Sequence, residues 1–296
     1  MRVFVTGASG WIGSAVVPEL LNAGHDVVGL ARSDASADAI AAVGAEAHRG
    51  SLEDLQSLRD GAEKSDGVIH LGFIHDFAEY DAANETDRRA IAAMGDALAG
   101  SQRPLVIASG VATGAVGRPA TEDDPPIPDF PRSEAALMTV ALADAGVRSA
   151  VVRLPPTTHG RGDKGFISML VGIAREKGVS GFVGDGANVW PAVHRSDAAR
   201  VFRLALEVAP AGSVYHAVGE EGVATRTIAE VIGQRLDVPV VSIAPNDVAE
   251  HFGWLGAIWA IDAPTSNALT QERLGWHPDG PGLLEDLEAG HYFATD

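Results

Sequence analysis

The chain has 296 residues, 22 lysines plus arginines against 40 aspartates plus glutamates, and no cysteine. Its formal net charge of −18 opposes binding to a nucleic-acid backbone or an anionic membrane, so we expect neither partner. The absence of cysteine excludes disulfides, thiolate metal sites and a cysteine nucleophile, and we expect no metal centre. No apolar targeting segment precedes the first predicted strand, which favours a cytoplasmic location.

A glycine-rich turn separates the apolar run 2–5 from a helical pattern at 15–21. In Thr6-Gly7-Ala8-Ser9-Gly10-Trp11-Ile12-Gly13, the first glycine permits a tight turn and the second lets backbone approach a diphosphate. The third lets the helix pack on the strand, and N–H groups at the start of that helix attract phosphate. The turn therefore predicts a dinucleotide site that includes Gly7, Ser9, Gly10, Trp11, Ile12 and Gly13.

The second predicted strand, 26–30, is followed by Ala31-Arg32-Ser33. In a dinucleotide fold, the residue about 20 positions past the glycine turn meets the ribose, where an acid selects NAD and an arginine selects NADP. Arg32 and Ser33 thus favour NADP(H), while Asp34, one step further on, leaves NAD open.

Further strand–helix units follow in chain order. We expect strands at 45–48, 68–71, 104–109 and 148–154, helices at 35–43, 53–60, 82–99 and 133–145, and a loop at 121–131. Five such units predict an α/β, Rossmann-like, doubly wound parallel sheet in a core of residues 1–155. Residues 156–296 are expected to form mostly a smaller C-terminal substrate lobe, with segments near 187–218 returning to the core.

The carboxyl ends of parallel strands bind ligands, so residues there are candidates for the site. We expect cofactor contacts from Leu52, Leu71, Gly72, Phe73, Ser109 and Pro155. His70, inside a strand, is interpreted as a core histidine. The candidate catalytic groups are Ser109 and, on the loop after the fourth strand, His75 and Tyr80. Substrate contacts are expected from Thr113, His159, Trp190 and His194.

These stretches resemble the extended short-chain dehydrogenases/reductases, also called the NAD-dependent epimerase/dehydratase family. The glycine turn is similar to the family's cofactor fingerprint, and Val68-Ile69-His70-Leu71-Gly72 to its fourth-strand motif. Asn84, Arg153-Leu154-Pro155-Pro156, Gly184-Asp185-Gly186, Val193-His194-Arg195-Ser196-Asp197 and Leu274-Gly275-Trp276-His277-Pro278 resemble its later elements. The resemblance implies a Rossmann fold, a nicotinamide cofactor and a small-molecule substrate, and leaves a homodimer open.

The family's usual catalytic pair, Tyr-x-x-x-Lys, is absent. The spacing falls on Phe130-Pro131-Arg132-Ser133-Glu134, so the chain resembles the atypical branch, with Arg132 a candidate for a cofactor phosphate or an anionic substrate. We predict an NADP(H)-dependent oxidoreductase acting on a small carbonyl or alcohol substrate. The alternatives are a non-catalytic NAD(P)-binding sensor and a sugar-nucleotide epimerase or dehydratase.

Overall fold

A seven-stranded parallel sheet organises the chain in the computed structural model, which describes residues 1–75, 79–111, 115, 117–128, 130 and 132–294. The strand order is β10-β6-β5-β4-β1-β2-β3, so the direction of winding reverses between β1 and β4. The predicted Rossmann-like parallel sheet is confirmed. Its strands are β1 (Arg2–Thr6), β2 (Asp26–Ala31), β3 (Glu46–Arg49), β4 (Gly67–His70), β5 (Pro104–Gly110), β6 (Arg148–Leu154) and β10 (Ser213–His216).

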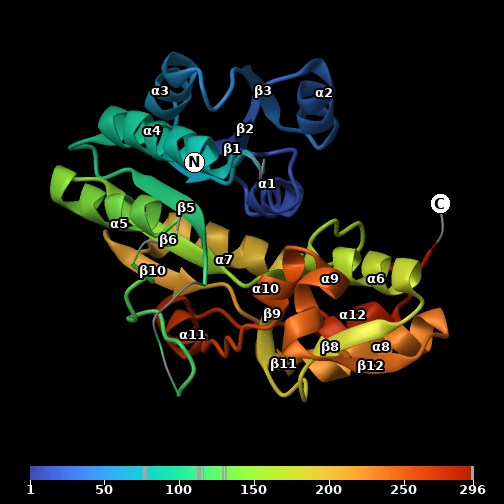
Figure 1. Ribbon diagram of the computed structural model, residues 1–296. Coiled ribbons are helices and arrows are strands. Elements are labelled where there is room, and N and C mark those ends of the chain that lie inside the picture. The colour runs from blue at the N-terminus through green and yellow to red at the C-terminus, as the bar shows by residue number, and fades with distance from the viewer. Residues whose placement is uncertain (76–78, 112–114, 116, 129, 131, 295–296) are drawn as a thin grey trace.

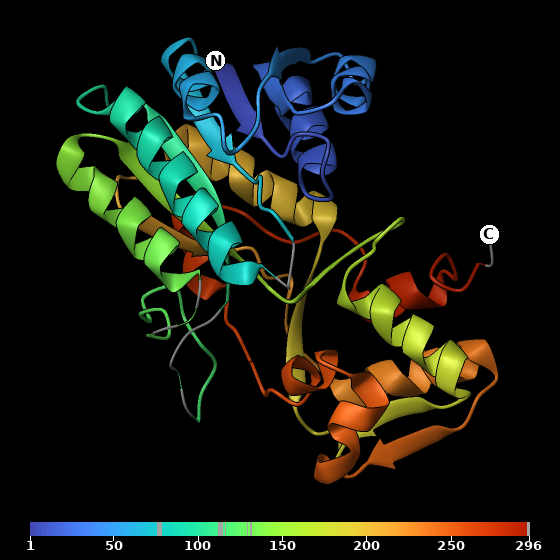
Figure 2. The ribbon, with the colours of Figure 1, turned by 45° about the horizontal axis from the view of Figure 1, so that its top comes forward.

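Helices cover both faces of this sheet because its strands carry buried residues on alternate sides. Val3 and Val5 pack with α1 (Gly13–Asn22), α2 (Asp34–Ala42) and α7 (Arg195–Val208), whereas Phe4 packs with the other group. That second group is α3 (Leu55–Glu63), α4 (Tyr80–Leu98) and α5 (Ser133–Ala141), which a 3₁₀ turn (Leu142–Ala145) extends. Figure 2 shows α4 and α5 side by side.

A smaller lobe lies beside the sheet at the lower right of Figures 1 and 2. Its own apolar core contains Trp190 and Trp259. The lobe contains α6 (Phe166–Lys177), β8 (Ser180–Val183), α8 (Thr225–Leu236), β12 (Val240–Ile243), η2 (Pro245–Asp247), α9 (Val248–Phe252), α10 (Leu255–Trp259) and α12 (Leu283–Glu288). A three-stranded sheet of β7 (Thr157–His159), β9 (Val189–His194) and β11 (Glu220–Ala224) links it to the larger sheet, and α11 (Ala268–Leu274) lies near β10.

The chain crosses between these two parts more than once. After β9, α7 packs against α1, and β10 pairs with β6 in the large sheet. The division into domains at residue 155 stays a prediction. Among the described residues, no helix has the length and hydropathy that a membrane span requires.

Candidate cofactor and substrate site

The glycine turn is packed so closely that side chains are excluded from it. A Cβ on Gly7, whose φ is +67°, would lie 2.7 Å from the amide nitrogen of Gly72, and a Cβ on Gly13 would lie 2.1 Å from the carbonyl oxygen of Gly7. The turn therefore presents bare backbone at the point where the strand order reverses, and Ile12, the residue before α1, makes no side-chain capping hydrogen bond. This cradle of glycine backbone and N–H groups fits a dinucleotide diphosphate.

The ribose end of the candidate site contains an arginine that sequence reasoning missed. β2 and β3 are neighbours in register, with Ala31 opposite Arg49, so Arg32 and Arg49 lie at adjacent carboxyl ends. Arg49 forms an ion pair with Asp34, the residue that left NAD open. The side chain of Ser33 accepts a hydrogen bond from the backbone N–H of Ser36 and caps α2. Only the pairing of β2 with β3 identifies Arg49.

A buried hydrogen-bond chain runs from the cofactor turn to α4. The backbone N–H of Gly72 donates to Thr6 Oγ1 at 3.0 Å, which leaves the Thr6 hydroxyl proton for His70 Nδ1 at 2.7 Å. On the other side of the ring, His70 Nε2 lies 3.0 Å from Asp87 Oδ1, close enough for its N–H to donate to that carboxylate. The core histidine expected from the sequence is thus a link between the first strand and α4.

Arg132 joins this chain at the carboxyl ends of β4 and β5. Its Nη2 donates to the carbonyl oxygen of Ala108 at 2.8 Å and lies 3.6 Å from Asp87 Oδ2. Its Cζ lies 4.4 Å from the centroid of the Phe73 ring, a cation–π distance. Its Nε is buried without a hydrogen-bond partner among the described residues. A fixed guanidinium with an unpaired N–H therefore lies where parallel sheets bind ligands.

Two of the predicted catalytic groups lie around the same phenylalanine. The Phe73 ring centroid is 5.2 Å from that of His75 and 5.9 Å from that of Tyr80. Burial and the charge of Arg132 lower the pKa of His75, and burial raises the pKa of Tyr80. Tyr80 is the first residue of α4, so its expected place on a loop was wrong: the helix begins two residues earlier than its pattern indicated.

The remaining cofactor candidates follow the sheet edge. Ser109, the third catalytic candidate, is buried near the end of β5, and Pro155, just past β6, is buried too. Leu52 lies against the turn, since a Cβ on Gly72 would lie 3.0 Å from its side chain. The backbone of Leu71 and Gly72 lies against Gly7, where a Cβ would be 2.8 Å from the carbonyl carbon of Leu71.

Of the predicted substrate residues that the structure describes, Trp190 and His159 are buried and His194 is half-buried, and the rings of His159 and His194 lie 5.5 Å apart. Trp190 is 1% exposed, and its ring lies 4.7 Å from that of Trp259, so its expected substrate contact is corrected to a core role in the lobe. His159 is fully buried, with Nδ1 2.9 Å from Asp286 Oδ2, and cannot touch a substrate directly in this structure. His194 is half-buried and caps α7. Thr113 lies outside the described residues.

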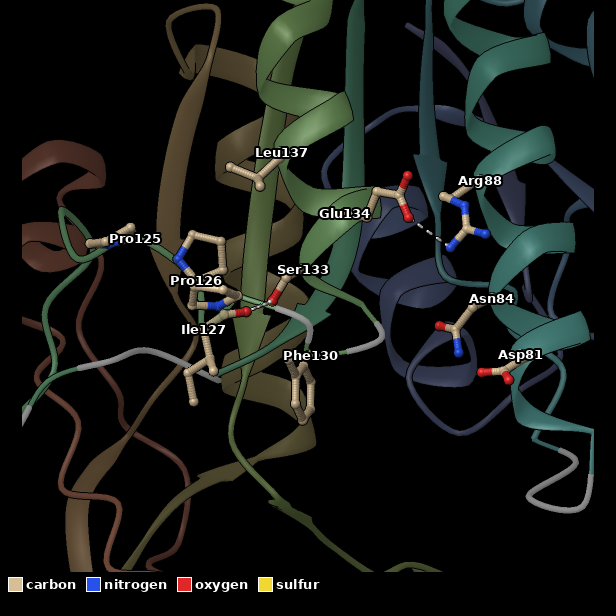
Figure 3. Close-up of a pocket in the computed structure, with 11 residues that line it drawn as sticks. Asp81, Asn84, Arg88, Pro125, Pro126, Ile127, Phe130, Ser133, Glu134 and Leu137 are labelled. Atoms are coloured by element: carbon tan, nitrogen blue, oxygen red, sulfur yellow. Dashed lines mark hydrogen bonds and ion pairs between the residues drawn. The ribbon is translucent and has the colours of Figure 1, made fainter.

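The positions at which the resemblance places the family's Tyr and Lys border a cavity beside α5. This cavity has a volume of about 560 Å³ and lies between α4, α5 and residues 125–128 (Figure 3). Phe130 and Glu134 both line it, and Glu134 pairs with Arg88 at 3.1 Å. Asn84 lines the same cavity, with its amide donating to the carbonyl oxygen of Tyr80. Between Phe130 and Glu134, Arg132 turns inward to β5.

Comparisons with known proteins agree with this geometry. The model of the NAD dependent epimerase/dehydratase family matches residues 3–218. An uncharacterised protein of Schizosaccharomyces pombe is 49% identical over 295 residues, which cover 99% of this chain and 100% of that protein. A 4-hydroxy-2-methyl-3-oxo-4-farnesyl-3,4-dihydroquinoline-1-oxide ketoreductase of Stigmatella aurantiaca is 28% identical, with 90% of this chain and 84% of that protein covered.

Solved structures show the same fold. DesIV, a dTDP-glucose 4,6-dehydratase of Streptomyces venezuelae solved with NAD and TYD bound, matches with a TM-score of 0.79 and 20% identity over 99% of this chain and 97% of that one. The family match covers well over half of the chain. The chain therefore belongs to the NAD-dependent epimerase/dehydratase family, as an enzyme with the NAD(P)-binding Rossmann fold of an oxidoreductase.

Proposed function

We propose that this enzyme is an NADP(H)-dependent oxidoreductase acting on a small carbonyl or alcohol substrate at the carboxyl edge of the large sheet. The observation that carries the proposal is the guanidinium of Arg132, which Ala108, Asp87 and Phe73 hold and whose Nε has no hydrogen-bond partner in the described part of the chain. The similarity to a ketoreductase supports the same reaction class. The nicotinamide, held by the glycine turn, would supply or accept the hydride.

In this proposal Arg132 and Tyr80 together take the roles of the family's catalytic Tyr and Lys: one stabilises the oxyanion and the other donates the proton. An arginine stays protonated at any working pH, so Arg132 donates hydrogen bonds to a developing oxyanion rather than transferring a proton. The phenol of Tyr80, whose pKa burial raises, keeps its proton at neutral pH and can deliver it to the substrate oxygen. His75, whose pKa is lowered, is neutral there and serves as a hydrogen-bonding group.

The test is NADPH oxidation by purified protein across a panel of aldehydes and ketones. With the best substrate, Arg132→Met should lower kcat about 100-fold or more, because a preorganised donor to the oxyanion is lost. The dissociation constant of NADPH should stay within about twofold. Arg88→Met, which removes an arginine that lines the cavity between α4 and α5 and pairs with Glu134, is the matched control and should keep wild-type kcat.

The alternatives give different outcomes in the same assay. If the wild type binds NADPH tightly but oxidises none with any member of the panel, the sensor hypothesis replaces ours. A sugar nucleotide converted without net change in the cofactor would instead favour an epimerase or dehydratase.

A preference for NADP over NAD follows from the ribose end. Arg32 and Arg49 place two guanidinium groups at neighbouring strand ends, where a 2′-phosphate would lie. Asp34 is occupied by Arg49 and is thereby drawn away from a ribose hydroxyl. These contacts support NADP(H) as the cofactor that binds more tightly.

A homodimer is the partner that the surface supports. Leu137, Phe130 and Ile127 are 56%, 40% and 39% exposed around the cavity between α4 and α5. Clustered exposed apolar side chains mark an interaction surface in a water-soluble protein. The cytoplasm is the proposed location, because proteins there fold without disulfides and this chain has no cysteine to form one.

A further inference from the structure

Arg195 lies beside the cofactor turn although the two are far apart in the sequence. α1 and α7 pack against each other, and both begin at the carboxyl edge of the large sheet. Trp11 belongs to the glycine turn just before α1, and Arg195 is the first residue of α7. The guanidinium Cζ of Arg195 lies 4.5 Å from the centre of the Trp11 ring.

The loop that follows β7 closes around this pair. The indole N–H of Trp11 donates to the carbonyl oxygen of Thr158 at 2.9 Å. A Cβ on Gly160, whose φ is +150°, would lie 3.3 Å from Cγ and Cδ of Arg195, so the arginine stem passes directly over glycine backbone. The ring on one side and the glycine on the other therefore restrict the directions in which the guanidinium can point.

The charge of Arg195 is not balanced by any residue that the structure describes. Among the described residues, no hydrogen bond or ion pair engages Arg195, which is half-buried. The two acids that act on the neighbouring His194 already have partners: Asp197 pairs with Arg200 at 2.7 Å, and Asp286 with His159 at 2.9 Å. In a chain of net charge −18, an unpaired, positioned cation next to phosphate-binding backbone indicates an anionic ligand.

We propose that Arg195 is a second anchor for the diphosphate of the dinucleotide, opposite the backbone N–H groups of the glycine turn. Arginine binds phosphate oxygens with charge-assisted, often paired hydrogen bonds, and the Trp11 ring holds its plane in place. Because Arg195 and the loop 158–162 come from the second half of the chain, that half would take part in cofactor binding. This inference rests on the proposed function only in requiring that a dinucleotide binds.

The experiment is calorimetric titration of the full chain with NADP⁺, NAD⁺ and 2′-AMP, which has no phosphate at its 5′ position. Arg195→Gln should weaken the binding of NADP⁺ and NAD⁺ by the same factor, about 10- to 100-fold, and leave the binding of 2′-AMP unchanged. Arg195→Lys keeps the positive charge but not the planar group that stacks on Trp11, so it should lose less of the affinity for the dinucleotides. Arg226→Gln is the matched control, because Arg226 also lies over a ring, that of Phe182 in the lobe, at 5.4 Å.

The outcomes separate this inference from the proposed function. If the wild type binds neither dinucleotide, the proposed function fails first. If the wild type binds both and Arg195→Gln binds them equally well, Arg195 is no anchor and the inference is overturned. An equal loss for 2′-AMP, or the same loss in Arg226→Gln, would also overturn it, because the effect would then be a general one on folding. The loss confined to ligands with a diphosphate supports it.

Discussion

At the scale of single residues, cofactor choice depends on side chains from two strands. We predict that Arg32→Ala weakens the binding of NADP⁺ about 10- to 100-fold and leaves the binding of NAD⁺ unchanged, because only NADP⁺ has the 2′-phosphate. Arg49→Ala should also weaken the binding of NADP⁺. It should strengthen the binding of NAD⁺, because Asp34 is then released to accept hydrogen bonds from the ribose hydroxyls. Calorimetric dissociation constants for both cofactors measure this exchange.

2′-AMP serves as the control ligand, since its affinity should follow that of NADP⁺ in both variants. Equal losses for NADP⁺ and NAD⁺ would show that these arginines act on the adenosine or the diphosphate instead. The pattern is the reverse of that expected for Arg195→Gln, so the two sets of variants check each other.

Residue roles were predictable from the sequence where they depend on local backbone. Gly7 and Gly13 belong to a short turn whose geometry the glycine spacing alone predicts. The structure shows the close approaches that exclude a side chain at both positions. Arg132 could be noticed but not explained, because its partners Asp87 and Ala108 come from other elements. Trp190 was misassigned because a tryptophan in a core and one in a pocket look alike in a sequence.

At the scale of elements, strand periodicity and glycine positions located most helices and strands, and the pairing between them was the part that the sequence left out. His216 in β10 illustrates this. Its Nδ1 donates to the carbonyl oxygen of Ser266 at 2.8 Å, and its Nε2 lies 3.3 Å from a guanidinium nitrogen of Arg153 in β6. Nothing in the local sequence of either strand indicates this buried contact.

That contact predicts how stability depends on pH. Burial, with the nearby Arg153, lowers the pKa of His216, although the hydrogen bond to Ser266 and the carboxylates of Glu122 and Asp124 act in the opposite direction. The unfolded chain takes up a proton near pH 6.5 that the folded chain resists, so stability is full above that pH and falls as pH decreases through it. The midpoint of urea unfolding should therefore decrease between pH 7 and pH 5.

His216→Gln isolates the contribution of this histidine. The variant should be less stable at pH 7, because it loses packing, but its unfolding free energy should depend less steeply on pH, by up to about 1.4 kcal/mol per pH unit. His25→Gln, at a half-buried surface pair with Glu207, is the comparison. An unchanged slope in His216→Gln would mean that other groups, such as His194, whose pKa burial also lowers, carry the effect.

At the scale of the whole molecule, charge and apolar surface act in opposite directions on self-association. Two copies of net charge −18 repel each other, and dissolved salt screens that repulsion over about 10 Å at 0.1 M. The apolar residues around the α4–α5 cavity attract each other without regard to charge. The proposed dimer should therefore become tighter as ionic strength rises, unlike a dimer held by ion pairs.

The dimer predicts a specific effect of a single substitution. Leu137→Asp adds a charge at the most exposed of the three apolar residues around the cavity and should convert the dimer to a monomer, as measured by sedimentation equilibrium in 0.15 M salt. Val208→Asp is the matched control, because Val208 is 58% exposed at the end of α7, on the opposite face of the sheet. A wild-type chain that stays monomeric at high salt and micromolar concentration, or equal dissociation in both variants, would contradict an interface at α4 and α5.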